Sequence, residues 1–361
     1  GKIHYVRPRG AQPTGSAQMQ VKGLTRSGVT RTSAPIDIGV NGVLTADRLA
    51  LRALAASNGT IIGRGQALLA PLGAGSIVER LENAPVQAQL RYSGPAEALW
   101  RLSGVEIVDL GGAVTLSANV RGTLAQPAIT GSVATNNATF VSPITGMNVT
   151  GLRSIGQFDG SQLVLRSFEG QTRGGGKVSG SGRFDFSAVQ GIGIDLTLQA
   201  TNAEMLNRDD LGAYVTGPIT IRSDGNGGVI GGNLDVARSR FTLGRAAAVA
   251  QIPELQVIEK NGRRGGDDFD PPVVAKPWTL DMKARARNRL MVDGMGLNSE
   301  WRMTMDIGGN VTAPVLTGTA EMVRGSYDFA GRRFDLTDGT LRFDGRTPVN
   351  PTLDITAEAS V

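Results

Sequence analysis

The sequence contains no cysteine and a single histidine, His4, close to its first residue. Without cysteine the chain can form no disulfide, no thiolate metal site and no cysteine nucleophile, and its redox compartment cannot be inferred. A Ser-His-Asp mechanism would have to use His4, which we expect to be solvated. We therefore predict a protein that is not an enzyme, with no catalytic residue, no metal site and no cofactor.

Long apolar runs are absent as well. No stretch approaches the roughly 18 apolar residues of a membrane-spanning helix, and no signal peptide is recognisable. The chain begins with Gly1 rather than methionine and stops at Val361 within an alternating run. We expect it to be part of a longer protein.

Aromatic residues and concentrated charge are scarce. Aromatics make up 5% of the chain, and 37 basic residues against 32 acidic ones give a formal charge of +5. The basic residues are scattered, and their longest clusters are pairs such as Arg263–Arg264. A nucleic-acid-binding surface would gather basic residues into a stripe with aromatic residues between them. We expect no nucleic-acid partner, while weak attraction to an anionic membrane surface is allowed.

Glycine, in contrast, is abundant. The chain has 50 glycines in 361 residues, which is about twice the usual share. Glycine weakens helices and marks turns, so this composition indicates many short strands. Apolar residues make up 40%, too many for a disordered chain. The length alone suggests roughly two domains, but an elongated β architecture adds strands without adding domains.

Apolar and polar residues alternate with a period of two in many segments. In Trp278–Arg287 every second residue is apolar and the residues between are polar or charged. Strict alternation places one face of a strand in an apolar environment and the other in water. The pattern predicts an all-β fold whose strands have one dry and one wet face. It recurs in Val86–Tyr92, Val114–Val120, Ile194–Ala200, Trp301–Ile307 and Leu353–Ala359.

A short repeat accompanies this alternation. Gly122–Gly131 and Gly309–Gly318 share the order glycine, aliphatic, proline, aliphatic, threonine and glycine at equal spacing. In both copies an aromatic residue lies nine positions after the last glycine. A third copy matches this pattern less well, because it has no proline. We expect a strand, a turn marked by proline and a second strand. The first copy contains Pro127 and is followed by Phe140, the second contains Pro314 and is followed by Tyr327, and the third has Ile230, Gly232 and Phe241 at the matching positions.

Few segments suggest a helix. Pro95–Leu102 has a proline suited to a first helical turn and ends at Ser103–Gly104. Asp47–Ala56 is compatible with either a helix or a strand. Asn261–Pro272 is polar and rich in glycine and proline, as expected for a loop or hinge.

Three polar motifs have simple structural explanations. Gly174–Gly180 lacks the first glycine and the hydroxyl residue of a phosphate-binding loop, and alternation continues through it, so we expect a strand. Asp267–Asp270 does not have the spacing of a calcium loop, and we expect an exposed acidic loop. Asp224–Gly228 is expected to be a tight turn.

The last quarter of the chain resembles the C-terminal domain of the TamB family. The resemblance rests on glycines, aromatics and an Asn-Pro-x-Leu-Asp element at characteristic positions, and it is specific from about residue 110 to 361. These signature residues are Gly325, Tyr327, Gly331, Arg332, Phe334, Leu336, Gly339, Phe343, Gly345, Asn350, Pro351, Leu353 and Asp354.

This resemblance implies a fold and a function. The family is similar to AsmA-like proteins of the periplasm of diderm bacteria, which carry an N-terminal inner-membrane anchor; we expect this anchor to lie outside the present sequence. Their long β-sheet is curled into a trough, called a β-taco, that is apolar inside and polar outside. The implied partners are an Omp85-type outer-membrane barrel, TamA or BamA-like, together with outer-membrane protein substrates and phospholipid acyl chains. The implied roles are outer-membrane protein insertion, autotransporter secretion and phospholipid transport between the two membranes.

The resemblance also suggests how the chain is organised. We expect an upstream β segment at 1–110, TamB-type β repeats at 111–260, a loop or hinge at 261–277 and a signature segment at 278–361. The fold class is therefore an all-β, elongated, open solenoid-like trough with a hydrophobic interior and few short helices.

Many inward positions are small, such as Ala88, Ala118, Ala200 and Ala284, and small residues leave room for an acyl chain. We predict a hydrophobic groove that is lined by the larger apolar residues lying between these small ones. The alternatives are a closed β-sandwich, a surface or secreted β-solenoid adhesin or passenger, and an outer-membrane β-barrel, which needs aromatic girdles. The predicted groove residues are Leu116, Val120, Leu196, Leu198, Leu280, Met282, Met303, Met305, Phe334, Leu336 and Phe343.

Overall fold

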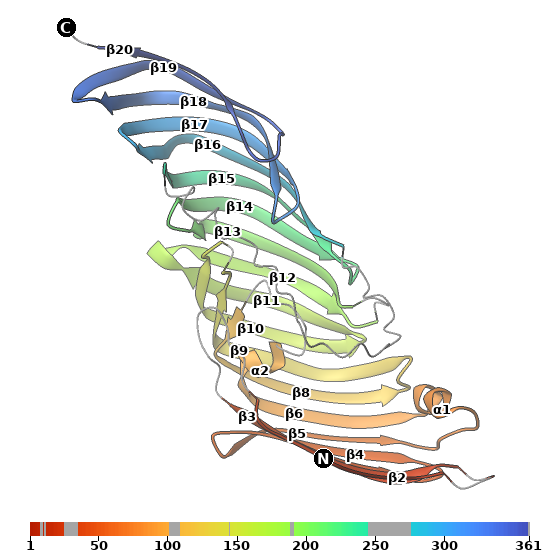
Figure 1. The fold of residues 1–361 in the computed structure, drawn as a ribbon. Helices are drawn as coiled ribbons and strands as arrows, with labels where there is room; N and C mark the ends of the chain where they lie inside the picture. The colour runs from red at the N-terminus through yellow and green to blue at the C-terminus, as the bar shows by residue number, and fades with distance from the viewer. Residues whose placement is uncertain are drawn as a thin grey trace, which may run out of the picture. The chain divides into compact units, whose positions relative to one another are not determined.

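A computed structural model describes residues 1–7, 10, 12–24, 35–100, 109–143, 145–187, 191–244 and 276–359. Its contacts divide the chain into unit 1, Gly1–Ala203, and unit 2, Glu204–Val361. Figure 1 shows the chain, and each unit is described by itself below. The predicted segments 1–110, 111–260 and 278–361 stay predictions. Of the predicted loop at 261–277, only Lys276 and Pro277 lie among the described residues.

The predicted all-β class is confirmed, because 75% of the structure is strand and 5% is helix. Unit 1 contains β1 (Lys2–Val6), β2 (Thr14–Leu24), β3 (Ile36–Leu44), β4 (Leu49–Ser57), β5 (Thr60–Leu69), β6 (Val86–Pro95), β7 (Asp109–Gly111), β8 (Ala113–Gly122), β9 (Pro127–Val141), β10 (Asn148–Gly160), β11 (Gln162–Thr172), β12 (Lys177–Asp185) and most of β13 (Gly193–Asn207). Unit 2 contains β14 (Leu211–Ser223), β15 (Gly228–Thr242), β16 (Trp278–Gly294), β17 (Leu297–Gly309), β18 (Pro314–Phe329), β19 (Arg332–Asp344) and β20 (Thr352–Glu358).

Nearly all strand pairs are antiparallel neighbours in the sequence. In unit 1 the pairing runs in chain order, except that β6 pairs with β8 and the short β7 pairs with β9. In unit 2 the one parallel pair among the described strands is β15–β16, and residues 245–275 between them lie outside the described part. Among the described residues β1 pairs only with β2 and β20 only with β19, so the sheet is open and does not close on itself.

The alternation predicted from sequence is present in the strands. In β16 Ala284 and Ala286 are buried, while Arg285 and Arg287 are exposed. The edge strands β1 and β20 depart from this pattern, because Ile3 is 83% and Leu353 63% exposed. An edge strand has a neighbour on one side only, so its apolar side chains are half uncovered.

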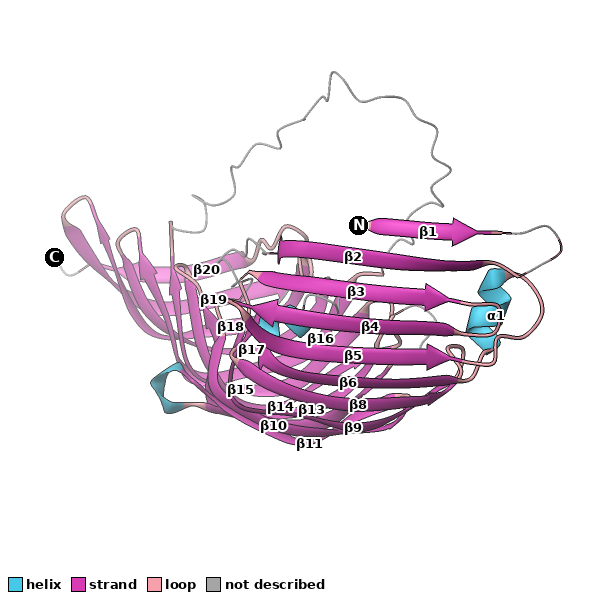
Figure 2. Cartoon of the chain, turned by 90° about the horizontal axis from the view of Figure 1, so that it is seen from below, coloured by secondary structure: helices cyan, strands magenta, loops and turns pink. Residues whose placement is uncertain are grey.

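The sheet of each unit is curved, and its ladders contain bulges that account for bending. The strands of unit 1 from β2 to β9 form an open, curved sheet (Figure 2). Register shifts occur in the pairs β10–β11, β11–β12, β15–β16, β16–β17 and β17–β18. Each extra residue in a ladder bends its strand and increases the local twist. The strands chiefly contact the neighbours with which they pair, as in a trough rather than a closed sandwich.

The helical predictions are met in part. The helix predicted at Pro95–Leu102 is observed as α2 (Ala96–Trp100), directly after Pro95, while Leu102 lies outside the described residues. Most of Asp47–Ala56 forms strand β4, which pairs with β3 and β5 along its whole length. A further helix, α1 (Ile77–Asn83), was not predicted. The strand expected through Gly174–Gly180 begins only at Lys177, the start of β12, because Arg173–Gly175 forms the short 3-10 turn η2.

Both helices cover apolar surface in unit 1. Ala96 of α2 is 1% exposed and packs in a cluster with Ile62, Tyr92 and Val114. The α1 segment contributes Leu81 and its C-cap Ala84 to a second cluster around Leu69 and Val86. Part of the apolar face of unit 1 is therefore an internal core.

The predicted repeat is a strand–turn–strand unit in both of its clear copies. β8 ends at Gly122 and β9 begins at Pro127, while β17 ends at Gly309 and β18 begins at Pro314. Proline can begin a strand because the first residue does not need its N–H in the ladder. The two copies, far apart in the sequence, thus build the same hairpin.

Candidate functional site: an apolar face in each unit

Residues that lie directly opposite one another in successive strands form rows across each sheet. In unit 2 these rows are built of apolar residues and glycine, so they form one continuous apolar face. One row is Leu234–Ala284–Met305–Gly318–Phe343, the next is Ala286–Met303–Ala320–Leu341–Leu353, and a third is Ile219–Gly232–Met282–Ile307–Leu316.

Unit 1 has rows of the same kind that cross more strands. The longest contains no polar residue from β2 to β13, and a parallel row contains Val120. The long row is Val21–Ile38–Ala55–Gly63–Tyr92–Leu116–Val133–Gly156–Leu165–Gly182–Leu196. The second is Ala17–Gly42–Leu51–Ala67–Ala88–Val120–Ile129.

Every predicted groove residue falls within one of these two faces. Met305 and Leu336 are buried, and the other predicted residues are half-buried. Those of unit 1 are Leu116, Val120, Leu196 and Leu198, and those of unit 2 are Leu280, Met282, Met303, Met305, Phe334, Leu336 and Phe343. Their role in binding stays a prediction.

Glycines in the rows let large neighbours close over the backbone. A Cβ placed on Gly156 would lie 2.7 Å from Leu165 Cδ2 and 2.9 Å from Val133 Cγ1. The leucine and valine on the two neighbouring strands therefore occupy the space above Gly156. Large and small residues alternate across the strands, which explains part of the high glycine content and smooths the apolar surface.

The largest fully buried side chain of unit 2 is Trp301, which is 1% exposed. Its Nε1–H donates a hydrogen bond of 2.8 Å to Ser299 Oγ. The adjacent Glu300 accepts bonds from the backbone N–H of Arg289 at 3.1 Å and from Arg324 Nε at 2.8 Å. The polar groups at this bulge are thus satisfied within the sheet. Trp301 alternates with Met303 in the sequence, so its inward position was visible, but its near-complete burial was not.

The two faces differ in what covers them. In unit 1, α2 lies on the face, and Tyr92 Oη donates a bond of 2.6 Å to the Pro95 carbonyl oxygen just before it. Unit 2 contains no helix among its described residues. Its apolar face includes three half-buried methionines, Met282, Met303 and Met322.

The opposite face of each sheet is polar. Cross-strand ion pairs join Arg302 to Glu321 at 2.6 Å and Arg183 to Asp195 at 3.0 Å. Exposed pairs of this kind contribute less than about 1 kcal/mol each, so they mark a solvated surface. On this face of unit 2, burial, and then the hydrogen bond to Glu204, raises the pKa of Tyr214, whose ring packs under Arg238.

The described residues contain no group of three or more His, Asp or Glu that could hold a metal ion. None of the helices in the described part of the chain is long and apolar enough to cross a membrane.

Comparison with known families shows to which family the chain belongs. The family described as "TamB C-terminal domain" matches residues 166–361, which is more than half of the sequence. The chain belongs to the TamB family. No curated protein and no solved structure matches it. The match begins at residue 166 and not near residue 110, so the first copy of the repeat, Gly122–Gly131, lies outside it.

TamB proteins are periplasm-spanning proteins of the bacterial envelope with a role in outer-membrane assembly or transport. In this chain the TamB signature lies on the last three strands and the turns between them. Gly325 and Tyr327 are on β18, Phe334 to Phe343 are on β19, and Leu353 is on β20. Leu336 is paired with Gly325, and Phe334 with Tyr327, so much of the signature packs within one apolar patch.

Proposed function

We propose that the apolar faces of this TamB chain hold apolar cargo during its passage between the inner and outer membranes. The cargo is phospholipid acyl chains, and the activity is passive, with no covalent chemistry by the chain. The site of action is the periplasm, where the whole protein is held by an N-terminal inner-membrane anchor and works with an Omp85-type barrel, TamA or BamA-like.

The observation that carries this proposal is the set of unbroken apolar rows. Each buried methylene group of a lipid tail gains about 0.8 kcal/mol, so such a face holds an acyl chain without any specific polar contact. The methionines at Met282, Met303 and Met322 add flexible, polarisable side chains that adapt to cargo of different shape. A binding surface without polar selectivity suits a transported lipid better than a substrate that must be distinguished from others.

A second candidate cargo is an unfolded outer-membrane protein strand, for insertion or autotransporter secretion. Strand β20 supports it, since among the described residues it pairs only with β19 and exposes Leu353 and Ile355. An unpaired edge can accept an additional strand through backbone hydrogen bonds. Membership of the TamB family favours either cargo over the adhesin or passenger function.

Site-specific photocrosslinking in cells distinguishes the two cargoes. A photoreactive residue at Met303 faces the apolar side, and one at the adjacent Thr304 faces the polar side, where it is exposed. Phospholipid adducts at Met303 but not at Thr304 are the expected result. Adducts to protein strands alone would favour the second candidate, and equal adducts at both positions would contradict a binding face.

A substitution at the same position tests function. Met303→Asp places a charge on the apolar face, where burial disfavours it, and should reduce outer-membrane integrity as strongly as deletion of the gene. Asn233→Asp adds the same charge on the polar face, where Asn233 is exposed and pairs with Lys283, and should leave integrity unchanged. Arg302 is a poorer control because it is paired with Glu321, so an aspartate there would repel its neighbour. Protein levels of both variants must be equal for the comparison to count.

A further inference from the structure

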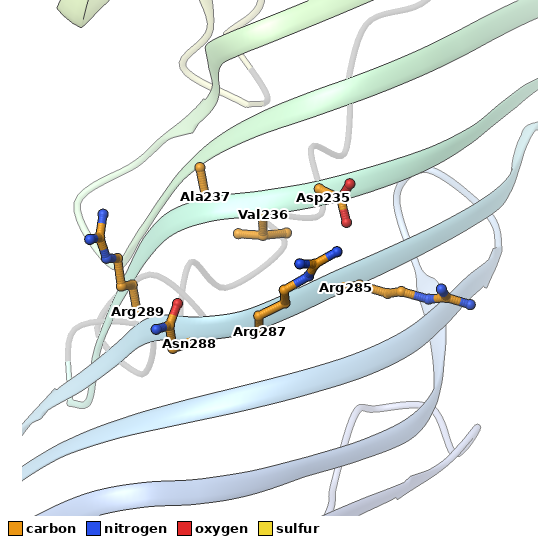
Figure 3. Close-up of a pocket in the computed structure, with 7 residues that line it drawn as sticks. All are labelled: Asp235, Val236, Ala237, Arg285, Arg287, Asn288 and Arg289. Carbon is orange, nitrogen blue, oxygen red and sulfur yellow. The ribbon is translucent and has the colours of Figure 1, made fainter.

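The parallel pair β15–β16 contains a gap in its ladder. Asp235 pairs with Arg285, and the next paired residues are Ser239 and Leu290. The intervening residues of both strands, 236–238 and 286–289, have no direct cross-strand partner in this pair. A hollow of about 290 Å³ lies at the gap (Figure 3).

Three arginines of β16 line this hollow, which we call the arginine hollow. Arg285, Arg287 and Arg289 are exposed, and none of them forms an ion pair within the described part of the chain. In Figure 3 the side chain of Arg287 extends from β16 toward Asp235 on β15, while Arg285 and Arg289 extend to either side of it. Three positive groups and one carboxylate leave the hollow with an excess of positive charge.

The neighbouring strands show that an arginine here can be neutralised. Arg302 on β17 is paired with Glu321 on β18, and Arg324 on β18 is paired with Glu300 on β17. On β16, Arg285 is paired with Asp235 and Thr304, and none of its arginines lies within ion-pair distance of Asp235. Their donors are therefore left for solvent or for an anion.

The backbone of the gap is held in place. Arg289 has φ of +67°, in the left-handed region, and its N–H donates to Glu300 Oε1 at 3.1 Å. Arg324 Nε binds the other oxygen of the same carboxylate at 2.8 Å. Glu300 thus fixes the backbone of the bulge from which Arg289 projects, so this backbone is already ordered before a ligand binds.

We propose that the arginine hollow binds a phosphate oxyanion on the polar face of unit 2. Guanidinium groups match the geometry of phosphate oxygens through pairs of parallel hydrogen bonds, and their charge strengthens each bond. The phosphate belongs either to an anionic lipid headgroup or to a free phosphate, and both offer the same oxygens. This site is separate from the apolar face, and it does not depend on the cargo proposed above.

The test compares two double variants of equal charge. Arg285→Gln with Arg287→Gln removes donors from the hollow, and Arg52→Gln with Arg64→Gln removes two exposed arginines without ion pairs from unit 1. Binding of the 361-residue chain is measured by calorimetry with inorganic phosphate. It is also measured by sedimentation with phosphatidylcholine vesicles, with and without phosphatidylglycerol. Circular dichroism checks that every variant is folded.

We expect the hollow variant to lose binding by about tenfold or more, since each guanidinium contact to an anion is charge-assisted, and the control variant to lose far less. Asp235→Asn should tighten binding, because it removes the one carboxylate in the hollow. Arginine-dependent binding of inorganic phosphate identifies a free phosphate, and binding only to phosphatidylglycerol vesicles identifies a headgroup. Equal losses in both double variants, weaker binding by Asp235→Asn, or no binding to either probe would overturn the proposal.

Discussion

At the scale of single residues, glycine explains why the repeat has its form. The last glycines of the two clear copies, Gly131 and Gly318, have the same φ of +139°. A Cβ on Gly318 would collide with the backbone carbonyl of Thr304, and one on Gly131 with that of Ser117. Both obstacles are backbone atoms of the partner strand, which cannot move aside as a side chain would. The matching positions in the sequence therefore reflect one backbone requirement.

This requirement predicts the result of a substitution. Gly318→Ala should lower the free energy of unfolding by about 1–3 kcal/mol, because it combines an unfavourable φ with a backbone clash. Urea unfolding followed by circular dichroism measures the change. Gly39→Ala is the matched control, since Gly39 also lies in a strand but has open space around its Cβ position and no positive φ. A loss of similar size in both variants would contradict this explanation, because Gly39 has neither the positive φ nor the backbone clash.

At the scale of elements, α1 shows what a local signal can specify. Ser76 and Glu79 form a capping box, in which the Glu79 N–H donates to Ser76 Oγ and the Ser76 N–H donates to Glu79 Oε2 at 3.0 Å. The spacing of serine and glutamate was present in the sequence and could have predicted this helix start. Arg80 ties the helix to the sheet by donating to the carbonyl oxygens of Gly73 and Ala46.

The capping box makes a prediction about pH. The hydrogen bonds from the Ser76 backbone and then from its hydroxyl lower the pKa of Glu79 below its ordinary value. A lowered pKa means that the stabilisation is present above the ordinary pKa and is lost as pH falls through the folded value. A carboxyl titration of Glu79 by NMR should give a midpoint below that of an unstructured glutamate.

Ser76→Ala removes the hydroxyl partner and should move this midpoint toward the ordinary value, and it should cost about 1 kcal/mol of stability. Ser76→Thr keeps a hydroxyl and should preserve the low midpoint. An unchanged midpoint in Ser76→Ala would mean that the capping hydroxyl does not act on Glu79.

At the scale of the whole molecule, the contacts that stabilise the strands are local. Strands chiefly contact the strands with which they pair, so each unit resembles a one-dimensional stack in which a strand depends on its immediate neighbours. Both units nevertheless carry an apolar face with rows of similar composition. A chain of this kind suits cargo that passes many equivalent positions.

If cargo passes the faces of both units in series, one block is enough to stop it. Leu196→Asp in unit 1 and Met303→Asp in unit 2 should each reduce lipid transport between membranes, and the double variant should be no worse than the stronger single one. Pulse labelling of outer-membrane phospholipid in cells measures this. Additive losses would instead indicate two independent paths, and no effect of Leu196→Asp would restrict function to unit 2.

The sequence by itself determined the strand content, the alternation of apolar and polar faces, the hairpins of the repeat and the family. These features depend on local geometry, since the pleat of a strand sends successive side chains to opposite faces, and glycine and proline mark the turns. It also predicted the apolar positions Leu116, Leu280 and Met303 for this reason.

Only the tertiary structure decided the register, the parallel pair β15–β16 and the choice of strand for Asp47–Ala56. It also placed α2 on the apolar face of unit 1 and left the arginines of β16 at a gap in the ladder. Each of these depends on which residues meet across strands. Because a register shift of one residue moves every side chain to the other face, packing against partners distant in the sequence selects the arrangement.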